Sequence, residues 1–236
     1  MFAQFYQNTI LKNPKSILII LIIALFSFGY YSKDFRLDAS SETLLIEGDP
    51  DLKYLQEISE RYGSKEFLIL TYTPNEGMVS DSSINNLLSL KYKIQSLDWV
   101  HSVITLLDIP LLNNSDAPLQ ERLESFKTLK DEDVDRNRGF NEILSSPVFR
   151  NFVISEDGKT SGIIVNIKKD GGLQNIEEKS KAEIENYKDR IKKQNHQNIL
   201  QIRDVINSYE DVGKIHLGGI PMIADDMMSF IKSDII

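Results

Sequence analysis

The chain contains no cysteine, and this removes several kinds of chemistry at once. Its 236 residues offer no disulfide, no thiolate metal ligand and no cysteine nucleophile. Oxidising and reducing compartments both hold such chains, so the absence leaves the location open. Glycine and proline number only 12 and 7, no low-complexity tract is present, and 41% of the residues are hydrophobic. This composition indicates a folded chain with one domain or two small ones.

Basic charge is also scarce. The chain has 27 Lys and Arg against 35 Asp and Glu, which gives a formal net charge of −8. Because an acidic protein is repelled by phosphate backbones, nucleic acid is not an expected partner. The basic run at residues 190–197 is flanked by acids, and we interpret it as a solvated helix face.

Motifs for catalysis and cofactor binding are missing as well. The three histidines, His101, His196 and His216, are far apart and show no metal-ligand spacing, so we interpret them as strand or surface residues. Residues 158–160 read Gly-Lys-Thr but lack the upstream glycine of a phosphate-binding loop. No Gly-x-Ser-x-Gly elbow occurs. The sequence therefore predicts no enzyme, no metal site and no cofactor.

One acidic segment comes close to a calcium-binding loop. Asp131, Asp133, Asp135 and Glu142 occupy positions 1, 3, 5 and 12 of such a loop. Position 6, where the sharp turn requires glycine, is Arg136. We therefore interpret the segment as a charged, solvated helix face, with calcium binding as the alternative.

The sequence has one long apolar run, at residues 16–32, where no charge occurs between Lys15 and Lys33. As a helix it would span roughly 25 Å at about 1.5 Å per residue, near the lower limit for a hydrocarbon core of about 30 Å. Tyr30 and Tyr31 would lie at the far interface, where aromatic residues gather. The run predicts an uncleaved transmembrane anchor.

Two other interpretations of this run stay open. It could be a cleaved signal peptide, with Ser27 and Gly29 as the small residues before the cleavage site, or it could be a buried core helix. The charges do not fix its orientation, because Lys33 and Arg36 nearly balance the basic residues before it. The large acidic domain that follows is more easily placed outside the cytoplasm.

Beyond the anchor, apolar strands alternate with amphipathic helices. A short strand is expected at residues 35–38 and a helix at 49–63. Residues 111–147 are polar and have a composition typical of helices, and we interpret them as an insertion. Strand 149–155 and the strand after it are joined by an Asp-Gly pair, which is a strong hairpin signal. Without the insertion and this first hairpin strand, the expected order is strand 66–73, helix 81–97, strand 100–106, strand 160–167, helix 198–209 and strand 214–218.

This β-α-β-β-α-β order is that of the split βαβ, or ferredoxin-like, arrangement. The predicted fold class is therefore α+β: an N-terminal transmembrane helix, then a ferredoxin-like domain with helical insertions. The fold by itself says little about function, because the same arrangement serves many unrelated activities.

Short motifs along the chain resemble one family in order. Residues 35–75 resemble the segment after the first membrane helix of RND (resistance-nodulation-division) exporters of the MMPL-type branch, and residues 217–235 resemble that family's passage into its second membrane helix. Residues 111–147 and 170–197 match poorly, and we expect helices particular to this lineage there. The motifs are Asp38-Ala39-Ser40, Asp49-Pro50, Ser155-x-Asp157-Gly158, Gly218-Gly219-x-Pro221 and Asp225.

The resemblance implies three parts: an amphipathic segment and transmembrane helix at 1–33, a periplasmic porter domain at 34–219, and the start of a helix leading into a second transmembrane segment at 220–236. It implies the N-terminal part of a proton-driven exporter of lipids or other amphiphilic molecules, cut at a membrane boundary. The implied location is the bacterial inner membrane, with the large domain in the periplasm. The implied partners are the bilayer, a lipidic substrate and the rest of the transporter, which carries the proton-relay carboxylates.

Within the last motif, Gly218, Gly219 and Pro221 are a candidate hinge at the approach to the membrane. Glycines allow a sharp turn and proline suits a first helical turn, but a plain strand-to-helix connection is the alternative. Two other functions are compatible with a membrane anchor followed by a large outer domain. One is the ligand-binding sensor domain of a membrane receptor. The other is an accessory subunit of a transporter whose remaining part is encoded separately. The sequence that follows Ile236 would discriminate among the three.

Overall fold

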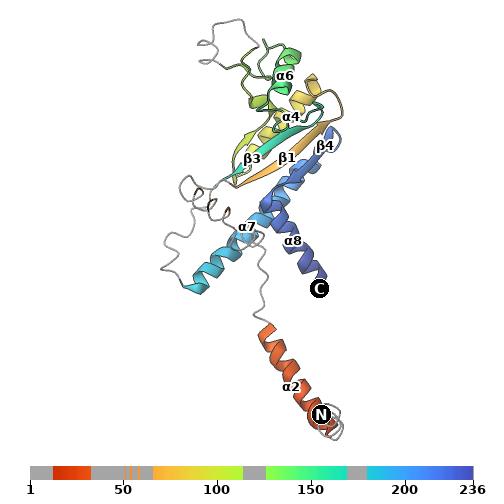
Figure 1. Ribbon diagram of the computed structural model, residues 1–236, viewed down its shortest axis with the longest axis vertical. Coiled ribbons are helices and arrows are strands. Elements are labelled where there is room, and N and C mark those ends of the chain that lie inside the picture. Colours follow the sequence, from red (N-terminus) through yellow and green to blue (C-terminus); the bar gives the residue numbers. More distant parts are fainter. Residues whose placement is uncertain are drawn as a thin grey trace. The chain divides into compact units, whose positions relative to one another are not determined.

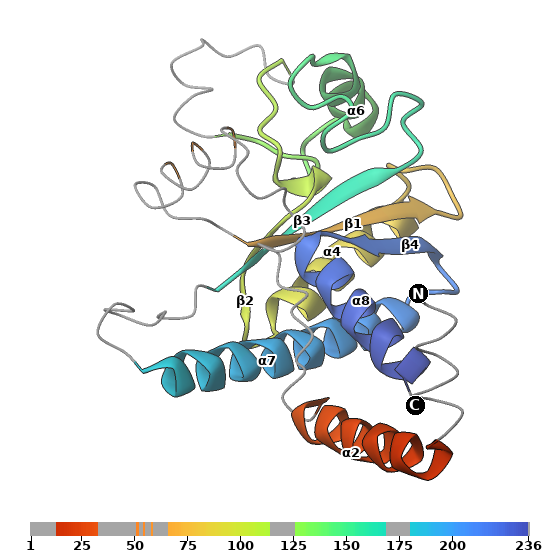
Figure 2. The same ribbon diagram turned by 60° about the horizontal axis from the view of Figure 1, so that its bottom comes forward.

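The chain forms two compact units, Met1–Asp38 and Ala39–Ile236, and each is described by itself. Figures 1 and 2 together label the helices and strands of both. The expected strand at 35–38, most of the expected helix at 49–63, and the motifs Asp38-Ala39-Ser40 and Asp49-Pro50 lie outside the described residues. The computed structural model describes residues 13–32, 66–113, 126–168 and 180–235, together with Asp51, Tyr54 and Ile58, which have helical backbone.

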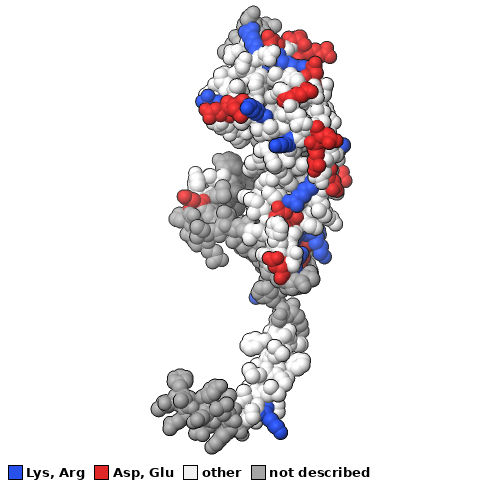
Figure 3. All heavy atoms as spheres, turned by 90° about the vertical axis from the view of Figure 1, so that its right-hand side faces the viewer, with Lys and Arg blue, Asp and Glu red and all other residues white. Residues whose placement is uncertain are grey.

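The first unit contains α2, Pro14–Ser32. Among the described residues, Pro14–Tyr31 is the one stretch long and apolar enough to cross a membrane, and none of it is buried. Figure 3 shows its surface as uncharged along most of its length. A core helix would be mostly buried, so that interpretation is not supported. A signal sequence passes the same test as a membrane anchor, so both of these interpretations stay open.

The second unit is built on a four-stranded antiparallel sheet with strand order β2-β3-β1-β4. The predicted α+β class is therefore confirmed, and each of the four strands in the expected order is present close to its predicted bounds. Ile69 of β1 lies opposite both Ile164 of β3 and Gly218 of β4. The strands are β1 (Phe67–Pro74), β2 (Val100–Ile104), β3 (Ser161–Ile167) and β4 (Gly213–Gly218).

Alternation along β1 explains why these residues form a strand with one buried face. Leu68, Leu70 and Tyr72 are fully buried, whereas Phe67 and Ile69, at alternate positions, are exposed. Successive side chains of a strand point to opposite faces, so the even positions enter the core and the odd ones line the other face. The sheet therefore has a covered face and an open face.

The helices α4 (Asp81–Gln95) and α7 (Lys181–Asn207) lie on the same side of the sheet, as Figure 2 shows. Ser80 caps α4 by accepting a hydrogen bond from the Ser83 amide at 3.1 Å. The core beneath α4 comes from positions at helical spacing that turn toward the sheet. These buried positions are Ile84, Leu87, Leu90 and Ile94.

Helical structure is expected at 170–197 as well as at 198–209, and the two parts form one continuous helix, α7, which begins at Lys181. Its N-terminus is fixed locally by a capping box between Ser180 and Glu183. The buried residues of α7 are Asn198, Ile199 and Ile202, all in its C-terminal part. The turns before Asn198 carry apolar residues at helical spacing, Ile184, Tyr187 and Ile191, but none of these is buried.

The segment predicted as a polar insertion contributes to the core. It contains α6, Arg136–Ser145, and Ile143 of this helix is buried together with Leu111 and Leu129. Leu111 also pairs with Lys127 in an isolated bridge. The insertion is therefore packed into the domain and is not a solvated appendage.

The strand predicted at 149–155 does not form. The Val153 amide donates to the Phe149 carbonyl at 2.9 Å, which closes a helical turn, and Asn151 has a φ of 65°. This turn buries Val153 and Ile154 without a ladder, although Ile154 makes an isolated bridge to Ser161. The predicted turn after it is present, because the Ser155 amide donates to the Thr160 carbonyl at 2.9 Å.

Candidate functional site at the start of α8

The junction between β4 and α8, Ile220–Ile235, brings the three candidate hinge residues together. Gly218 ends β4 and Pro221 is buried in the first turn of α8. Gly219 between them has a φ of 122°, and a Cβ built there would lie 3.1 Å from the Phe67 carbonyl oxygen and 3.2 Å from the Leu68 Cα. Only glycine meets both the conformation and the close approach to β1.

Polar contacts hold the first turns of α8 against α7. The Asn195 side-chain amide donates to the Pro221 carbonyl at 2.8 Å. His196 Nδ1 lies 2.9 and 3.1 Å from the two carboxylate oxygens of Asp225. Arg203 donates to both carboxylate oxygens of Asp226, at 2.8 and 3.0 Å. We call this set the polar seam; it consists of Asn195, His196 and Arg203 of α7 with Pro221, Asp225 and Asp226 of α8.

Asp225, the last of the sequence motifs, has a defined structural role in the polar seam. Its side chain is 9% exposed, and a carboxylate so far from water requires a partner, which His196 provides from a half-exposed position. The pair of Arg203 and Asp226 is more exposed, so it contributes less to stability. The seam thus fixes the direction of α8 relative to α7.

The outer side of α8 is apolar from Ile220 to Phe230, and the exposed Asp234 follows on the same side. Four large side chains are between 37% and 68% exposed, and they follow one another at spacings of three, four and three residues, which makes a single stripe. At about 100° per residue, Asp225 lies roughly 140–160° around the helix from most of this stripe. The α8 stripe consists of Ile220, Ile223, Met227 and Phe230.

The Asp157-Gly158 motif forms a turn and not a binding site. Ser155 Oγ donates to Asp157 at 2.6 Å and the Lys159 amide donates at 3.1 Å. These hydrogen bonds lower the pKa of Asp157 from its ordinary value, the bond from Ser155 most of all. Gly158 has a φ of 69°, which explains the glycine.

The calcium-like acids are each used separately. Asp135 caps α6 by accepting from two backbone amides, Asp131 accepts from Thr128, and Asp133 pairs with Lys127. The first three acids lie in turns before the helix, so the interpretation as a helix face is wrong for them. Among the described residues, no group of three or more His, Asp or Glu side chains is arranged to hold a metal ion.

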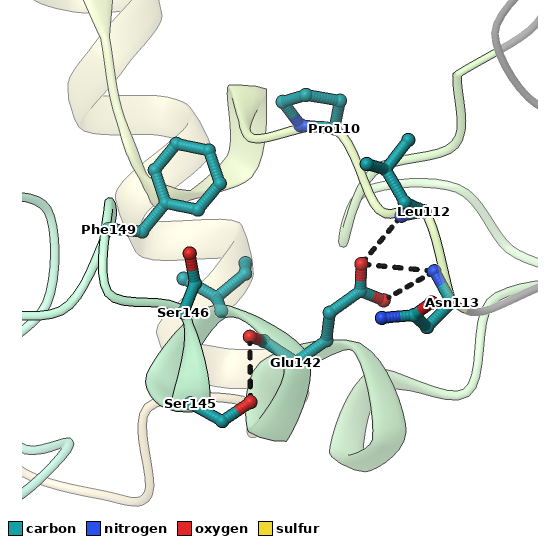
Figure 4. Close-up of a pocket in the computed structure, with 8 residues that line it drawn as sticks. Pro110, Leu112, Asn113, Glu142, Ser145, Ser146 and Phe149 are labelled. Carbon is teal, nitrogen blue, oxygen red and sulfur yellow. Dashed lines mark hydrogen bonds between the residues drawn. The ribbon is translucent and has the colours of Figure 1, made fainter.

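A cavity of about 490 Å³ lies beside α6, with Pro110, Ile143 and Phe149 among its lining residues. Figure 4 shows the Glu142 carboxylate turned toward the backbone of Leu112 and Asn113, whose amides donate to it at 2.6 and 3.0 Å. Because Glu142 is already satisfied by the protein, the cavity offers no free charge. We do not regard it as the functional site.

Sequence reasoning missed the polar seam. His101 and His216 are exposed strand residues, as expected, but His196 belongs to the seam although its basic run was interpreted as solvated. The sequence signal for the seam is a match between polar positions on one helix and acidic positions on the next. Positions 195, 196 and 203 share one face of a helix and meet the paired acids 225 and 226 of the next helix.

Compared with protein-family models and with curated proteins, the chain matches none. The resemblance to RND exporters therefore rests on the sequence motifs, and what they imply is a proposal.

Proposed function

We propose that this chain is the N-terminal part of a proton-driven RND/MMPL-type exporter of lipids or other amphiphilic molecules. It would contribute the first membrane anchor and the first porter domain, with that domain on the periplasmic side of a bacterial inner membrane. The observation that carries the proposal is the arrangement of α8, in which Asp225 faces inward while four large apolar side chains face outward.

The inversion matters because a helix on a water-exposed surface places its polar residues outward. In α8 Asp225 is buried and paired with His196, whereas the side chains of the α8 stripe are exposed. Isolated exposed apolar residues are ordinary, but a continuous stripe marks a surface that meets another apolar surface. A helix that leads into a bilayer, or packs on membrane helices, meets this requirement.

The strand order supports a ferredoxin-like porter domain. In that arrangement the two crossover helices lie on one face of an antiparallel sheet, and the first and third strands are central. In this chain β3 and β1 are central and β2 and β4 are at the edges. Helix α4 connects β1 to β2, and α7 connects β3 to β4, as the proposal requires.

The helix α2 would be the first anchor. Its 19 residues extend roughly 28 Å at about 1.5 Å each, enough to cross most of a hydrocarbon core. Tyr30 and Tyr31 near its end pack edge to face with ring centres 5.7 Å apart, and an aromatic pair suits a membrane interface.

In such an exporter, α8 would pass motion between the membrane and the domain. The polar seam ties its first turns to α7, and Gly219 packs directly against β1. We therefore propose that the junction at Gly218, Gly219 and Pro221 acts as a tight connection through which α8 and α7 move together. A loose hinge would lack these contacts.

Two experiments test the proposal. Sequencing the coding region after Ile236 should find about ten further membrane helices; one helix followed by a cytoplasmic signalling module would identify a receptor instead. Because the chain has no cysteine, single cysteines report its orientation without background. In cells with a permeabilised outer membrane, an impermeant maleimide should label Lys188→Cys and should leave Asn13→Cys unlabelled until lysis. The reverse pattern would contradict the proposal.

A further inference from the structure

The open face of the sheet carries a row of apolar side chains that crosses three strands. Ile104 of β2 lies opposite Ile164 of β3, which lies opposite Ile69 of β1. Phe67 is two residues from Ile69 on the same face. Ile104, Ile69 and Phe67 are between 39% and 45% exposed. We call these four side chains the open-face row.

The row ends at a position with no side chain. Gly218 of β4 lies opposite Ile69, and a Cβ built on Gly218 would contact only the Ile69 carbonyl oxygen, at 3.7 Å. The protein therefore leaves space beside Ile69. From Ile104 to Gly218 the row crosses three steps between strands, or roughly 14 Å at about 4.8 Å per step.

The same face is basic at its β4 edge, and its described strand residues include no carboxylate. Lys214 lies opposite Thr73 and His216 lies opposite Thr71, on the face of the open-face row. No described carboxylate forms an ion pair with Lys214. None of the strand residues of this face is Asp or Glu, although the chain contains 35 of them. These residues are Phe67, Ile69, Thr71, Thr73, Ser102, Ile104, Gly162, Ile164, Asn166, Lys214, His216 and Gly218.

We infer that this face binds an anionic amphiphile, such as a fatty acid or an acidic lipid. The acyl chain lies along the open-face row and the anionic head group reaches Lys214, with His216 beside it. The inference rests on the proposed function, because it names the class of cargo that the porter domain holds. The described strand residues of this face carry Lys214 and no carboxylate, on a chain of net charge −8, and this favours an anion over a cation of the same chain length.

The width of the surface favours one acyl chain over a protein partner. A stable protein interface buries about 800 Å² on each partner, with a broad apolar centre. The open-face row is narrow: its three isoleucines form one line across the strands, and Phe67 lies beside Ile69. Thr71 and Gly162 flank the line on one side; on the other, Asn166 lies opposite Phe67 and donates to Ser102 at 2.9 Å. A line of this kind matches the cross-section of one hydrocarbon chain.

The test uses photolabelling of the full chain in phosphatidylcholine nanodiscs. The probes are a diazirine-bearing palmitic acid, its methyl ester and the corresponding long-chain amine, and labelled peptides are located by mass spectrometry. Peptides with Phe67–Pro74 and Ser161–Ile167 should be labelled about tenfold more by the acid than by the amine, because an ion pair at Lys214 is replaced by repulsion.

Two kinds of variant separate the head group from the chain. Lys214→Glu should abolish the preference for the acid, whereas Lys188→Glu, with the same charge change on exposed α7, should preserve it. Ile69→Gln should lower labelling of both strands by about fivefold with every probe, because apolar contact is lost. Ile104→Gln repeats this test from another strand. Leu200→Gln, an exposed apolar position on α7, should have no effect.

Equal labelling by the three probes would overturn the inference, as would a preference that survives Lys214→Glu. Crosslinks between two copies through β1 would overturn it as well, because the occupant would then be a second chain. The exporter proposal fails separately, through the sequence after Ile236 or the cysteine orientation. Neither of those results alters the labelling.

Discussion

Helices α4 and α8 pack on the same sheet with opposite arrangements of polar and apolar residues. On α4 the buried positions are apolar, with Leu87 and Leu90 facing the core. On α8 a buried position is Asp225, and Phe230 is exposed. The difference shows that burial of apolar side chains holds α4 in place. The orientation of α8 is set by a few polar contacts, and its apolar stripe stays exposed.

The largest expected effect concerns the buried apolar side chains of α4. Leu90→Ala should lower the free energy of unfolding by about 3 kcal/mol, because a fully buried leucine leaves a cavity. Phe230→Ala should change it by less than about 0.5 kcal/mol. Urea unfolding of the full chain in nanodiscs can be followed by the fluorescence of Trp99, the only tryptophan, which donates to Gln201 at 2.9 Å. An equal cost at Phe230 would mean that the α8 stripe is packed within the domain.

The second prediction separates the two glycines before α8. Gly219→Val should cost about 3 kcal/mol, because it combines a positive φ with a clash against β1. Gly218→Val is the matched control, since a Cβ there meets only one carbonyl at 3.7 Å and β-branched residues suit strands. A loss at Gly219→Val as small as that of Gly218→Val in the same unfolding measurement would contradict the tight connection and favour a flexible junction.

The third prediction concerns the polar contact of α4. Lys91 of α4 pairs with Asp108, and the Thr105 amide donates to the same carboxylate at 2.9 Å. Burial alone would raise the pKa of Asp108, but the bonds from Lys91 and Thr105 outweigh it and hold the pKa below its ordinary value. Asp108→Asn should therefore cost about 2 kcal/mol at pH 7, because Lys91 is mostly buried and loses its partner.

The sign of the pH dependence follows from that lowered pKa. Stability from Asp108 is fully present above the ordinary carboxyl pKa and is lost as the pH falls through the lower pKa of the folded state. The free energy of unfolding of the wild type should fall between pH 5 and pH 2, and that of Asp108→Asn should fall less. Parallel curves for the two proteins would contradict the assignment. The control is Asp98→Asn, an exposed carboxyl, which should follow the wild type.

The parts of this fold that could be predicted from sequence are those whose signal is local. The apolar run around Leu68 and Leu70 predicted β1, and apolar residues at helical spacing from Ile84 predicted α4. The turn at Phe149–Val153 was mistaken for a strand because a helical turn and a strand bury short apolar runs equally well. Local pattern does not say which of these forms will fit beside β3.

The residues of the candidate site also differ in whether local sequence could predict them. The glycines and proline at 218–221 were found because turn chemistry is readable along the chain. The seam was not found, because His196 and Asp225 are 29 residues apart and meet only after α7 and α8 pack. A histidine on a polar helix has the same pattern whether it is solvated or paired. Three-dimensional packing alone distinguishes the two cases.

The smallest expected effect concerns the polar seam between α7 and α8. His196→Leu should cost about 1.5 kcal/mol, because Asp225 is left buried without its partner. Arg203→Leu should cost less than about 1 kcal/mol, since that pair is more exposed. Combining His196→Leu with Asp225→Leu should recover most of the loss, because two apolar partners replace two polar ones. If the double variant is instead as unstable as the sum of its parts, the two side chains act independently, and the polar seam cannot be what directs α8.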